Sequence, residues 1–314
     1  MTSNSQASPW ARAGVLGENP VFTAIAGAVF IASSAVLVKL ADASPVAVAV
    51  FRCLYALPFL GALALWESRR LGPLPRRARY LAWVAGIFFA VDLVLWHHAI
   101  EAVGAGLATV LGNLQVVIVG FVAWALLKEK PNSGLIFAVP VVLGGVVLIS
   151  GVASAEAYGK DPLAGVIYGA LTSVAYAGFL LVLRHGSQDL RRVAGPLFHA
   201  TAVAAVSAAL FGVVTGTLEA PPTAAGHGWL ALLAVAAQVV GWLLISLSLP
   251  RLPAAVTSII LLLQPVGAML LARFVLDEVP SPVQLGGAIL ILVGVIIATR
   301  SRSERTSPIP APAP

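Results

Sequence analysis

Long apolar runs alternate with short polar breaks along almost the whole chain. A helix needs about 20 consecutive apolar residues to span a bilayer, and proline, glycine and charged residues mark where such helices end. The pattern predicts ten membrane-spanning helices, at residues 21–41, 45–66, 80–100, 104–127, 133–151, 163–183, 194–217, 228–249, 254–276 and 282–299. Most connections between them are short turns at the membrane surface, so neighbouring helices are expected to run antiparallel. The predicted fold class is an all-α integral membrane protein.

The composition agrees with a membrane protein. Hydrophobic residues make up 59% of the 314 residues and charged residues only 10%, whereas a soluble domain has about 25% charged residues. A water-soluble globular protein is thereby excluded. The net charge of +6 is spread along the chain without a dense basic face interleaved with aromatic residues, so no nucleic-acid partner is expected. The expected partners are the lipid bilayer and a small-molecule substrate, and a homodimer is compatible with the sequence.

The basic residues are divided unequally between the two sides of the predicted membrane. Cytoplasmic loops of membrane proteins carry an excess of lysine and arginine. With the N-terminus inside, 15 of the 19 basic residues fall on the cytoplasmic side and Arg52 lies within a helix. The three on the other side are Lys39, Lys160 and Arg273. We therefore predict a multi-pass protein of the plasma (inner) membrane with both termini in the cytoplasm.

Polar tails are predicted at both ends of the sequence. Residues 1–20 contain no short apolar core followed by a small-residue cleavage site, so they are expected to form a cytoplasmic tail ahead of the first spanning helix. Residues 300–314 are polar and rich in proline, a composition that predicts a disordered cytoplasmic tail.

The chain contains an internal repeat that inverts across the predicted membrane. A shift of 149 residues superimposes two segments without a gap and matches polar residues and glycines, which coincide by chance less often than leucines. The matched pairs are Gln115 with Gln264, Glu129 with Glu278, Pro131 with Pro280, and Gly145 with Gly294. The repeat units are residues 21–151 and 163–299, with five helices each, and an odd number inverts the second unit. Inverted repeats are typical of secondary transporters, and duplication for packing alone is the alternative.

Several motifs resemble those of a known family. The run LDEVPSPVQLGGAILILVGV at residues 276–295 is similar to the signature that closes each repeat of the EamA transporters in the drug/metabolite transporter superfamily. Residues 127–146 hold a shorter copy of it. The segment GALTSVAYAGFLLVLR, which begins at Gly169, resembles the sixth helix of the family, and SPVAVAVFR, which ends at Arg52, resembles its second helix. The resemblance covers residues 21–299.

The resemblance implies a ten-helix carrier, commonly an exporter of amino acids or other small metabolites, driven by a proton gradient or by exchange rather than by ATP. The chain departs from the family pattern in two places. Residues 32–34 replace the Trp-Gly often seen in the first helix, and Val116 replaces the proline expected in the fourth, whereas Pro265 is present in the ninth. These departures argue against a close match to one substrate subgroup.

Two charged residues are predicted to lie inside the membrane. Arg52 and Asp92 each lie about eight residues, or roughly 12 Å, below the outer ends of consecutive antiparallel helices. A charge at this depth normally faces a partner, water or substrate, so the simplest hypothesis is that the two residues pair. The pair is either static and structural, or it binds an ionic substrate or releases a proton. Asp92 is the proton-coupling candidate.

Uncharged polar side chains are predicted near the midplane on several helices. Amides in a bilayer need hydrogen-bond partners, so these groups are expected to point inward, toward neighbouring helices or toward a cavity. Gln115 and Gln264 are expected to face each other across the pseudo-twofold axis. Ser33 and Ser34 lie at a similar depth, and Trp96 is a candidate for packing against a bound molecule. The substrate-cavity candidates are Arg52, Asp92, Asn113, Gln115, Tyr176, Gln238, Trp242 and Gln264.

The sequence offers few residues arranged for catalysis or for metal binding. His97, His98 and Glu101 lie at the outer end of the third predicted helix, but the metalloprotease pattern is absent, and no metal or cofactor is predicted. The sequence also lacks a nucleophile elbow, a phosphate-binding loop and a second intramembrane carboxylate. We therefore predict a secondary transporter that is not an enzyme and works by alternating access. The alternative is a non-transporting membrane protein, either an intramembrane enzyme or an assembly or receptor subunit.

Alternating access requires parts of the bundle to bend. Proline interrupts the backbone hydrogen bonding of a helix. Flexure is therefore expected near at least one of three prolines inside predicted helices, Pro58, Pro140 and Pro265.

Overall fold

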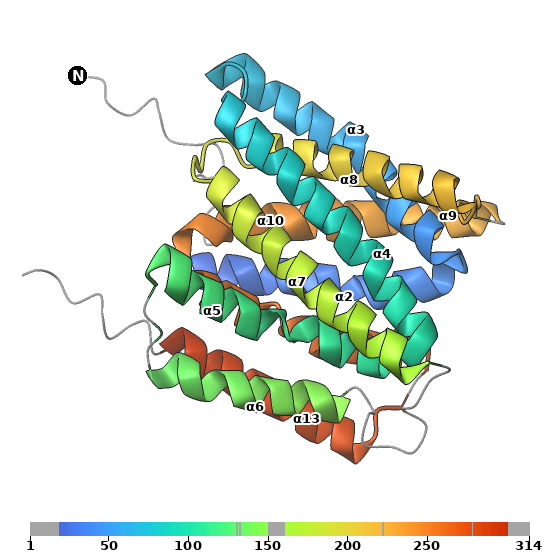
Figure 1. Cartoon of the computed structure of the whole chain (residues 1–314), viewed down its shortest axis with the longest axis vertical. Helices are drawn as coiled ribbons and strands as arrows, with labels where there is room; N and C mark the ends of the chain where they lie inside the picture. The colour runs from blue at the N-terminus through green and yellow to red at the C-terminus, as the bar shows by residue number, and fades with distance from the viewer. Residues whose placement is uncertain are drawn as a thin grey trace, which may run out of the picture.

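The computed structural model describes residues 19–129, 131, 133–149, 161–221, 223–277 and 279–300. Within these ranges the chain consists of helices and short connections and contains no strand (Figure 1). The predicted all-α class is thus confirmed. Most of both predicted tails lies outside the described residues, as does Glu278.

The observed helices reproduce the ten-helix architecture. The first half contains α2 (Pro20–Ala41), α3 (Pro45–Leu71), α4 (Arg76–Asn113), α5 (Gln115–Leu127) and α6 (Ser133–Ile149). The second half contains α7 (Pro162–Gly186), α8 (Ala194–Thr215), α9 (Ala224–Leu233), η1 (Ala234–Gly241), α10 (Trp242–Ser248), η2 (Leu249–Arg251), α11 (Ala254–Ile260), α12 (Leu263–Val275) and α13 (Pro282–Arg300). In the described ranges, eight segments are long and apolar enough to cross a membrane, and two shorter apolar ones complete the set.

Three helices begin with the same local device, a polar capping residue followed by proline. Asn19, Ser44 and Asp161 precede prolines at the starts of α2, α3 and α7, and each side chain accepts a hydrogen bond from a backbone N–H of the first turn. The oxygen satisfies an N–H that lacks an intrahelical partner, and proline has no N–H to leave unpaired at this position. The sequence therefore sets these helix starts locally.

The boundary between the third and fourth predicted helices lies within α4. We expected a turn near residues 101–103, and α4 is helical over all of its 38 residues. The chain nevertheless folds back inside α4, because a Cβ on Gly112 would lie only 3.8 Å from Cδ1 of Trp96, whereas 16 residues of straight helix span about 24 Å. Figure 1 shows α4 descending to the right and α5 lying to the left, in agreement with this reversal.

Two helix breaks occupy equivalent positions in the two repeats. One lies at Leu114, between α4 and α5, and the other at Leu261 and Leu262, between α11 and α12. The 149-residue shift brings these breaks to within one residue of each other. At both, backbone N–H groups bond to the carbonyl three residues back, as in a tighter 3₁₀ turn. Pro265 contributes to the second break because it cannot donate to the carbonyl of Leu261.

The eighth predicted helix is longer than expected and irregular. Helical structure runs from Ala224 to Arg251 and includes the π-helical segment η1. One turn of π-helix is rare and occurs frequently at functional sites. Here it carries Gln238, one of the predicted cavity residues.

The helices α6 and α13 are related by the repeat, and they cross with the same contact made from each side. A Cβ on Gly145 would lie 2.7 Å from the carbonyl oxygen of Gly287 and 2.8 Å from Ile291, so only glycine fits. A Cβ on Gly294 would meet Val142 in the same way. The 149-residue shift maps Gly145 onto Gly294 and Val142 onto Ile291, so each helix offers the same contact to the other. The inverted repeat predicted from the sequence is thus confirmed.

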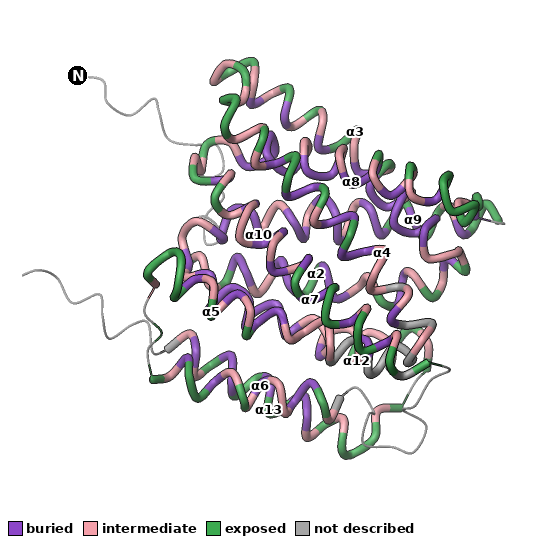
Figure 2. The backbone as a smooth tube through the Cα atoms, viewed as in Figure 1, coloured by how far each residue is buried: buried purple, intermediate pink, exposed green. Residues whose placement is uncertain are grey.

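The halves interlock rather than standing apart. Helix α4 packs on α7, α3 on α8, and α6 on α13, and every one of these pairs joins a helix of the first half to one of the second. Exposed residues recur along the outer faces of the bundle (Figure 2), and many are large and apolar, such as Val214 and Phe274. Apolar side chains exposed in such numbers suit contact with lipid rather than water.

The bundle has two ends, which we name by one residue each. At the Lys39 end, α2 turns into α3, and Gly226 packs against the backbone of Ala41. At the Arg184 end, α7 finishes and Arg184 bonds to Leu249. The segment from Ala224 to Arg251 therefore spans the distance between the two ends.

The α6–α13 crossing leads to a prediction for neighbouring glycines. Gly145→Ala places a methyl against the backbone of Gly287 and should destabilise the fold by about 1–3 kcal/mol, as overpacking does. Gly144→Ala is the matched control, because nothing lies within 4 Å of its added Cβ, and it should be neutral or slightly stabilising. Thermal unfolding in detergent measures both variants. Equal melting temperatures would contradict the close crossing.

Candidate functional site: a cavity between the two repeats

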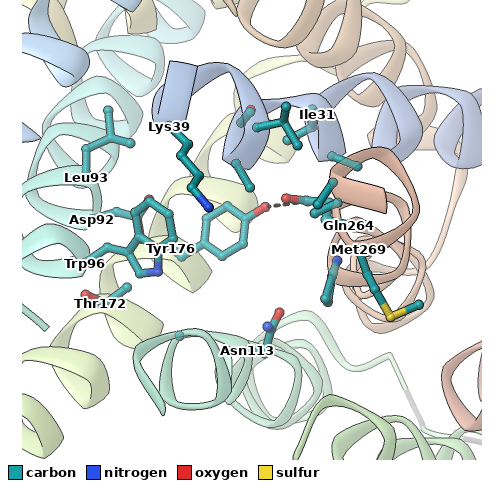
Figure 3. A pocket seen from close by; sticks show the side chains of 18 of the residues that line it. Ile31, Lys39, Asp92, Leu93, Trp96, Asn113, Thr172, Tyr176, Gln264 and Met269 are labelled. Carbon is teal, nitrogen blue, oxygen red and sulfur yellow. Dashed lines mark hydrogen bonds between the residues drawn. The ribbon is translucent and has the colours of Figure 1, made fainter. Parts of the chain in front are cut away.

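A large cavity takes its lining from both halves of the chain. Its volume is about 710 Å³, and it is bordered by α2, α3, α4, α7, α10, α12 and α13. Its charged, amide, hydroxyl and indole side chains are those of Ser34, Lys39, Arg52, Asp92, Trp96, Asn113, Thr172, Tyr176, Trp242, Gln264 and Gln284. Several of them converge on one space in Figure 3. The cavity extends to the Lys39 end, where Val279 and Pro280 border it.

Most of the predicted site residues meet in this cavity. Six of the eight candidates line it, namely Arg52, Asp92, Asn113, Tyr176, Trp242 and Gln264. Gln115 and Gln238 are fully buried and lie outside the lining. Ser34 and Trp96 also line it, whereas Ser33 does not.

Arg52 is held by an amide rather than by the expected carboxylate. Its Nη2 donates to Oε1 of Gln238 at 3.0 Å, and Nε2 of Gln238 donates to Oγ1 of Thr201 at 3.1 Å. Among the described residues, no direct ion pair joins Arg52 to Asp92, so the predicted pairing is corrected: both charges border the same cavity without touching. The reason is the π-helical segment, which brings Gln238 within reach of a guanidinium 186 residues away in sequence.

Three aromatic residues line one side of the cavity, Phe89, Tyr176 and Trp242, and the fully buried Phe179 packs against them. We call these four residues the aromatic cluster. Phe179 stacks on Phe89 with ring centroids 4.5 Å apart and meets Trp242 edge-on at 4.8 Å. Arg52 lies over the ring of Phe89, with its Cζ 5.7 Å from the centroid, a distance at which a cation and an aromatic face attract each other.

Four polar atoms of the cavity lining have no hydrogen-bond partner in the described structure. They are Ser34 Oγ, Arg52 Nε, Thr172 Oγ1 and Trp242 Nε1. Buried polar groups in native proteins are almost always paired, and each unpaired one costs about 1–3 kcal/mol. A cluster of four at one cavity is therefore the feature expected of a site that receives a ligand.

The repeat-related glutamines occupy different environments. Gln264 lines the cavity and donates to the hydroxyl of Tyr176 at 3.4 Å (Figure 3). Gln115 donates instead to the backbone carbonyl of Ser258, also at 3.4 Å, and is fully buried. The expectation that they face each other in the cavity is therefore corrected. The helix break before Gln115 directs its side chain toward α11.

Lys39 was not predicted as a cavity residue, because its place near a helix end indicated a surface charge. It lines the cavity, and its side chain extends from α2 toward Tyr176 (Figure 3). A sequence signal did exist. Ala32, Ala35 and Lys39 share one face of α2 by their spacing, and all three line the cavity.

The Arg184 end is closed by an ion pair between the two halves. Arg184 Nη2 lies 2.7 Å from Glu129 Oε1, and Glu129 Oε2 accepts from the backbone N–H of Ala254 at 3.0 Å. Arg184 also donates to the carbonyls of Leu249 and Leu252, at 3.0 Å each. The end of α5 is thereby joined to α7, η2 and α11. We call Glu129 and Arg184 the closing pair.

A second junction at the same end is buried more deeply. The carboxylate of Glu67 is 2% exposed and accepts hydrogen bonds from the backbone N–H groups of Val193, Ala194 and Gly195, at 2.8–2.9 Å. These groups form the start of α8, where the helix dipole favours negative charge. Arg192 donates to backbone carbonyls at the end of α3. This junction anchors α3 to α8.

The histidine cluster suggested by the sequence is only partly described. The side chains of His97 and Glu101 lie outside the described set, and His98 packs near the rings of Tyr168 and Phe211. Among the residues searched in the described ranges, no group of three metal-ligating side chains is close enough to hold a metal ion.

The protein consists of two interlocked, inverted five-helix repeats with a polar cavity between them. It therefore belongs to the class of integral membrane proteins that are built from inverted repeats. The sequence model of the EamA-like transporter family matches residues 19–151 and 163–300, and the chain belongs to this family. It is a multi-pass membrane transporter.

Comparisons with individual proteins agree with the family. An uncharacterized transporter of Bacillus subtilis (strain 168), YwfM, is 26% identical over 270 residues, which are 85% of this chain and 88% of that protein. A solved structure described only as "Crystal structure of protein" superimposes with a TM-score of 0.73 at 16% identity, covering 91% of this chain and 99% of the other. At that identity the second likeness concerns the fold alone.

The bonding of the two buried glutamines leads to a prediction. Gln238→Leu leaves Arg52 and Thr201 without their partner and should lower the free energy of unfolding by about 1–3 kcal/mol. Gln115→Leu is the matched comparison, since that side chain makes one long hydrogen bond and its Oε1 has no partner; it should cost less. Unfolding in detergent measures both. A larger loss for Gln115→Leu would contradict the role given to Gln238.

Proposed function

We propose that the protein is a secondary transporter that exports amino acids or other small metabolites by alternating access, driven by a proton gradient or by exchange. One observation carries the proposal: the cavity of about 710 Å³ lies between two inverted halves and takes its lining from both. Sites for small molecules commonly have volumes of about 300–1,000 Å³. Rocking of one half against the other changes the end at which such a cavity opens.

The proposed cycle assigns a state to this structure. The cavity reaches the Lys39 end, whereas the closing pair ties α5 to α7 and α11 at the Arg184 end. We assign the structure to the state that is open at the Lys39 end. In the opposite state the bond between Glu129 and Arg184 is broken, and the solute leaves or enters there. The helix breaks at Leu114 and Leu262 are the proposed points of bending.

The orientation in the membrane follows from charge. Basic residues gather at the Arg184 end, and cytoplasmic faces carry the excess of lysine and arginine. We therefore assign that end to the cytoplasm of a plasma (inner) membrane, with both termini there and the cavity open to the outside. The basic residues that support the assignment are Arg69, Arg70, Arg76, Arg77, Arg79, Arg184, Arg191, Arg192 and Arg251.

Asp92 is the proposed site of proton coupling. It is 9% exposed and borders the cavity together with Lys39 and Arg52. A carboxyl group at membrane depth that faces a cavity can take up a proton from one side and release it to the other. Its position beside the solute space allows solute binding and protonation to influence each other.

Transport by purified protein in proteoliposomes tests the proposal. Labelled amino acids, polyamines, sugars and aromatic cations are supplied with and without a pH gradient. We expect uptake or release of at least one solute class above empty liposomes, because both halves of the cavity lining belong to one chain. Absence of any protein-dependent flux across the panel would favour the alternative, a non-transporting membrane protein.

The coupling proposal concerns Asp92. Asp92→Asn should remove most of the stimulation by a pH gradient, by about tenfold or more, while solute exchange at equal pH continues. Asp189→Asn is the control, because Asp189 lies in a connecting loop and pairs with Arg191 and Arg192. If both variants respond to the gradient like the unchanged protein, Asp92 does not couple protons.

Cysteine accessibility tests the assigned state and orientation together. Cys53 is buried, so Ala268→Cys in a Cys53→Ala background provides a reporter within the cavity lining. A membrane-impermeant maleimide added to cells should label it, because the cavity is open to the outside. Labelling confined to inverted vesicles would reverse the orientation.

The same reporter tests the closing pair. Glu129→Gln weakens the bond to Arg184 and should slow external labelling of the reporter about threefold or more by favouring the opposite state. Asp189→Asn again serves as the control at the same end, since its ion pairs stay within one loop. The hydrogen bond from Arg191 lowers the pKa of the Asp189 carboxyl, which is therefore ionised at neutral pH. Equal labelling rates in the two variants would contradict the role of Glu129.

A further inference from the structure

Arg52 is a buried cation, and few of its N–H donors have a hydrogen-bond partner. Its side chain borders the cavity and the residue is 7% exposed, yet one hydrogen bond, to Gln238, is the only one found for it in the described structure. A guanidinium carries five N–H donors and no acceptor, and its Nε lacks a partner altogether. Only a hydrogen-bond acceptor can satisfy the remaining donors, and a negatively charged one does so best.

Trp242 offers the same kind of donor from the other half of the chain. The residue is 2% exposed, lines the cavity, and its indole Nε1 has no hydrogen-bond partner. Indole nitrogen donates and never accepts, and a buried Trp N–H usually finds a partner. Packing alone does not explain why this N–H stays unpaired next to a polar cavity.

The two donors border the same aromatic ring. Phe89 lies 5.7 Å from Arg52 Cζ and meets the Trp242 ring edge-on, with centroids 5.8 Å apart. Phe179 and Tyr176 also meet the Trp242 ring edge-on, with centroids 4.8 Å and 6.3 Å away. A solute lying against these rings is therefore within reach of both donors.

The other two polar atoms without a partner do not change which charge the cavity favours in a ligand. The hydroxyls of Ser34 and Thr172 also lack partners, but a hydroxyl both donates and accepts. Among the described residues that line the cavity, Lys39 and Arg52 are basic and Asp92 is acidic. Obligate donors and cations therefore outnumber acidic groups on the cavity wall.

We propose that Arg52 and Trp242 form an oxyanion subsite, which binds the carboxylate of an organic solute whose apolar or aromatic body packs on the aromatic cluster. The proposal rests on the transport function and narrows it, because it sets carboxylates above neutral or cationic solutes. Gln238 and Thr201 act as positioning residues that orient the guanidinium. In the bound state, Nε–H of Arg52 and Nε1–H of Trp242 donate hydrogen bonds to the carboxylate oxygens.

A matched set of probes tests the subsite. We choose 3-phenylpropanoate, 3-phenylpropanamide and 3-phenylpropylamine, which share one body and differ in charge. Calorimetry on the purified protein in detergent should show that the carboxylate binds at least about tenfold more tightly than the amide, or about 1.4 kcal/mol. The amine should bind more weakly still. A carboxylate that binds no better than the amide, or does not bind, overturns the proposal.

Variants locate the preference. Trp242→Phe keeps the ring and removes only the N–H, and it should reduce the carboxylate-to-amide affinity ratio about threefold or more. Arg52→Gln should reduce the ratio to near one. Trp124→Phe is the matched control, because that ring lies on an exposed face of α5, outside the cavity lining. An unchanged ratio in both Trp242→Phe and Arg52→Gln overturns the assignment, provided that each variant unfolds cooperatively.

The outcomes separate this proposal from the transport function. If the protein moves a solute into proteoliposomes but the affinity ratio is near one, the subsite is wrong and the transporter remains. If the carboxylate binds preferentially but no solute of the panel moves, the subsite stands and the transport function fails.

Discussion

Inside a bilayer every backbone N–H and C=O group needs a partner within the protein, and the form of this molecule depends on that constraint. Nearly all described residues are helical as a result. Two breaks in helical order near the middle of the bundle lie beside the cavity: Asn113 precedes the first break, Pro265 follows the second, and both line the cavity. Irregular backbone is tolerated where it borders a polar space. The breaks that we propose as points of bending therefore lie beside the space that we propose for the solute.

Charged side chains obey the same constraint. Arg52 is stabilised at membrane depth because Gln238 and Thr201 supply a hydrogen-bonded chain behind it while its face borders the cavity. Asp92 and Lys39 border the same space. The cost of burying charge thus concentrates the ionic groups of the membrane interior at one place. Any solute that enters meets them there.

The interlocking of the two halves accounts for both the cavity and its closure. Helices of one half pack mainly on helices of the other, so neither half can enclose the cavity by itself. The Glu67 junction is buried and ties α3 to the start of α8. The closing pair is less buried and ties α5 to α7. The more exposed joint is therefore the one that we propose to open during transport, while the buried Glu67 junction keeps the halves together.

The sequence by itself determined the ten apolar segments, the helix starts at capping residues such as Asn19, and the inversion shown by Gly145 and Gly294. These features depend on local chemistry or on internal comparison of the chain. The reversal expected near residues 101–103 also agrees with the structure, because the chain folds back between Trp96 and Gly112. Six of the eight predicted site residues line the cavity, since polar groups in hydrocarbon must point inward. Only the tertiary structure decided that Gln238 rather than Asp92 holds Arg52, that Gln115 turns away, and that Lys39 lines the cavity. Those outcomes depend on helix rotation and on contacts between residues distant in sequence, such as the 186 that separate Arg52 from Gln238.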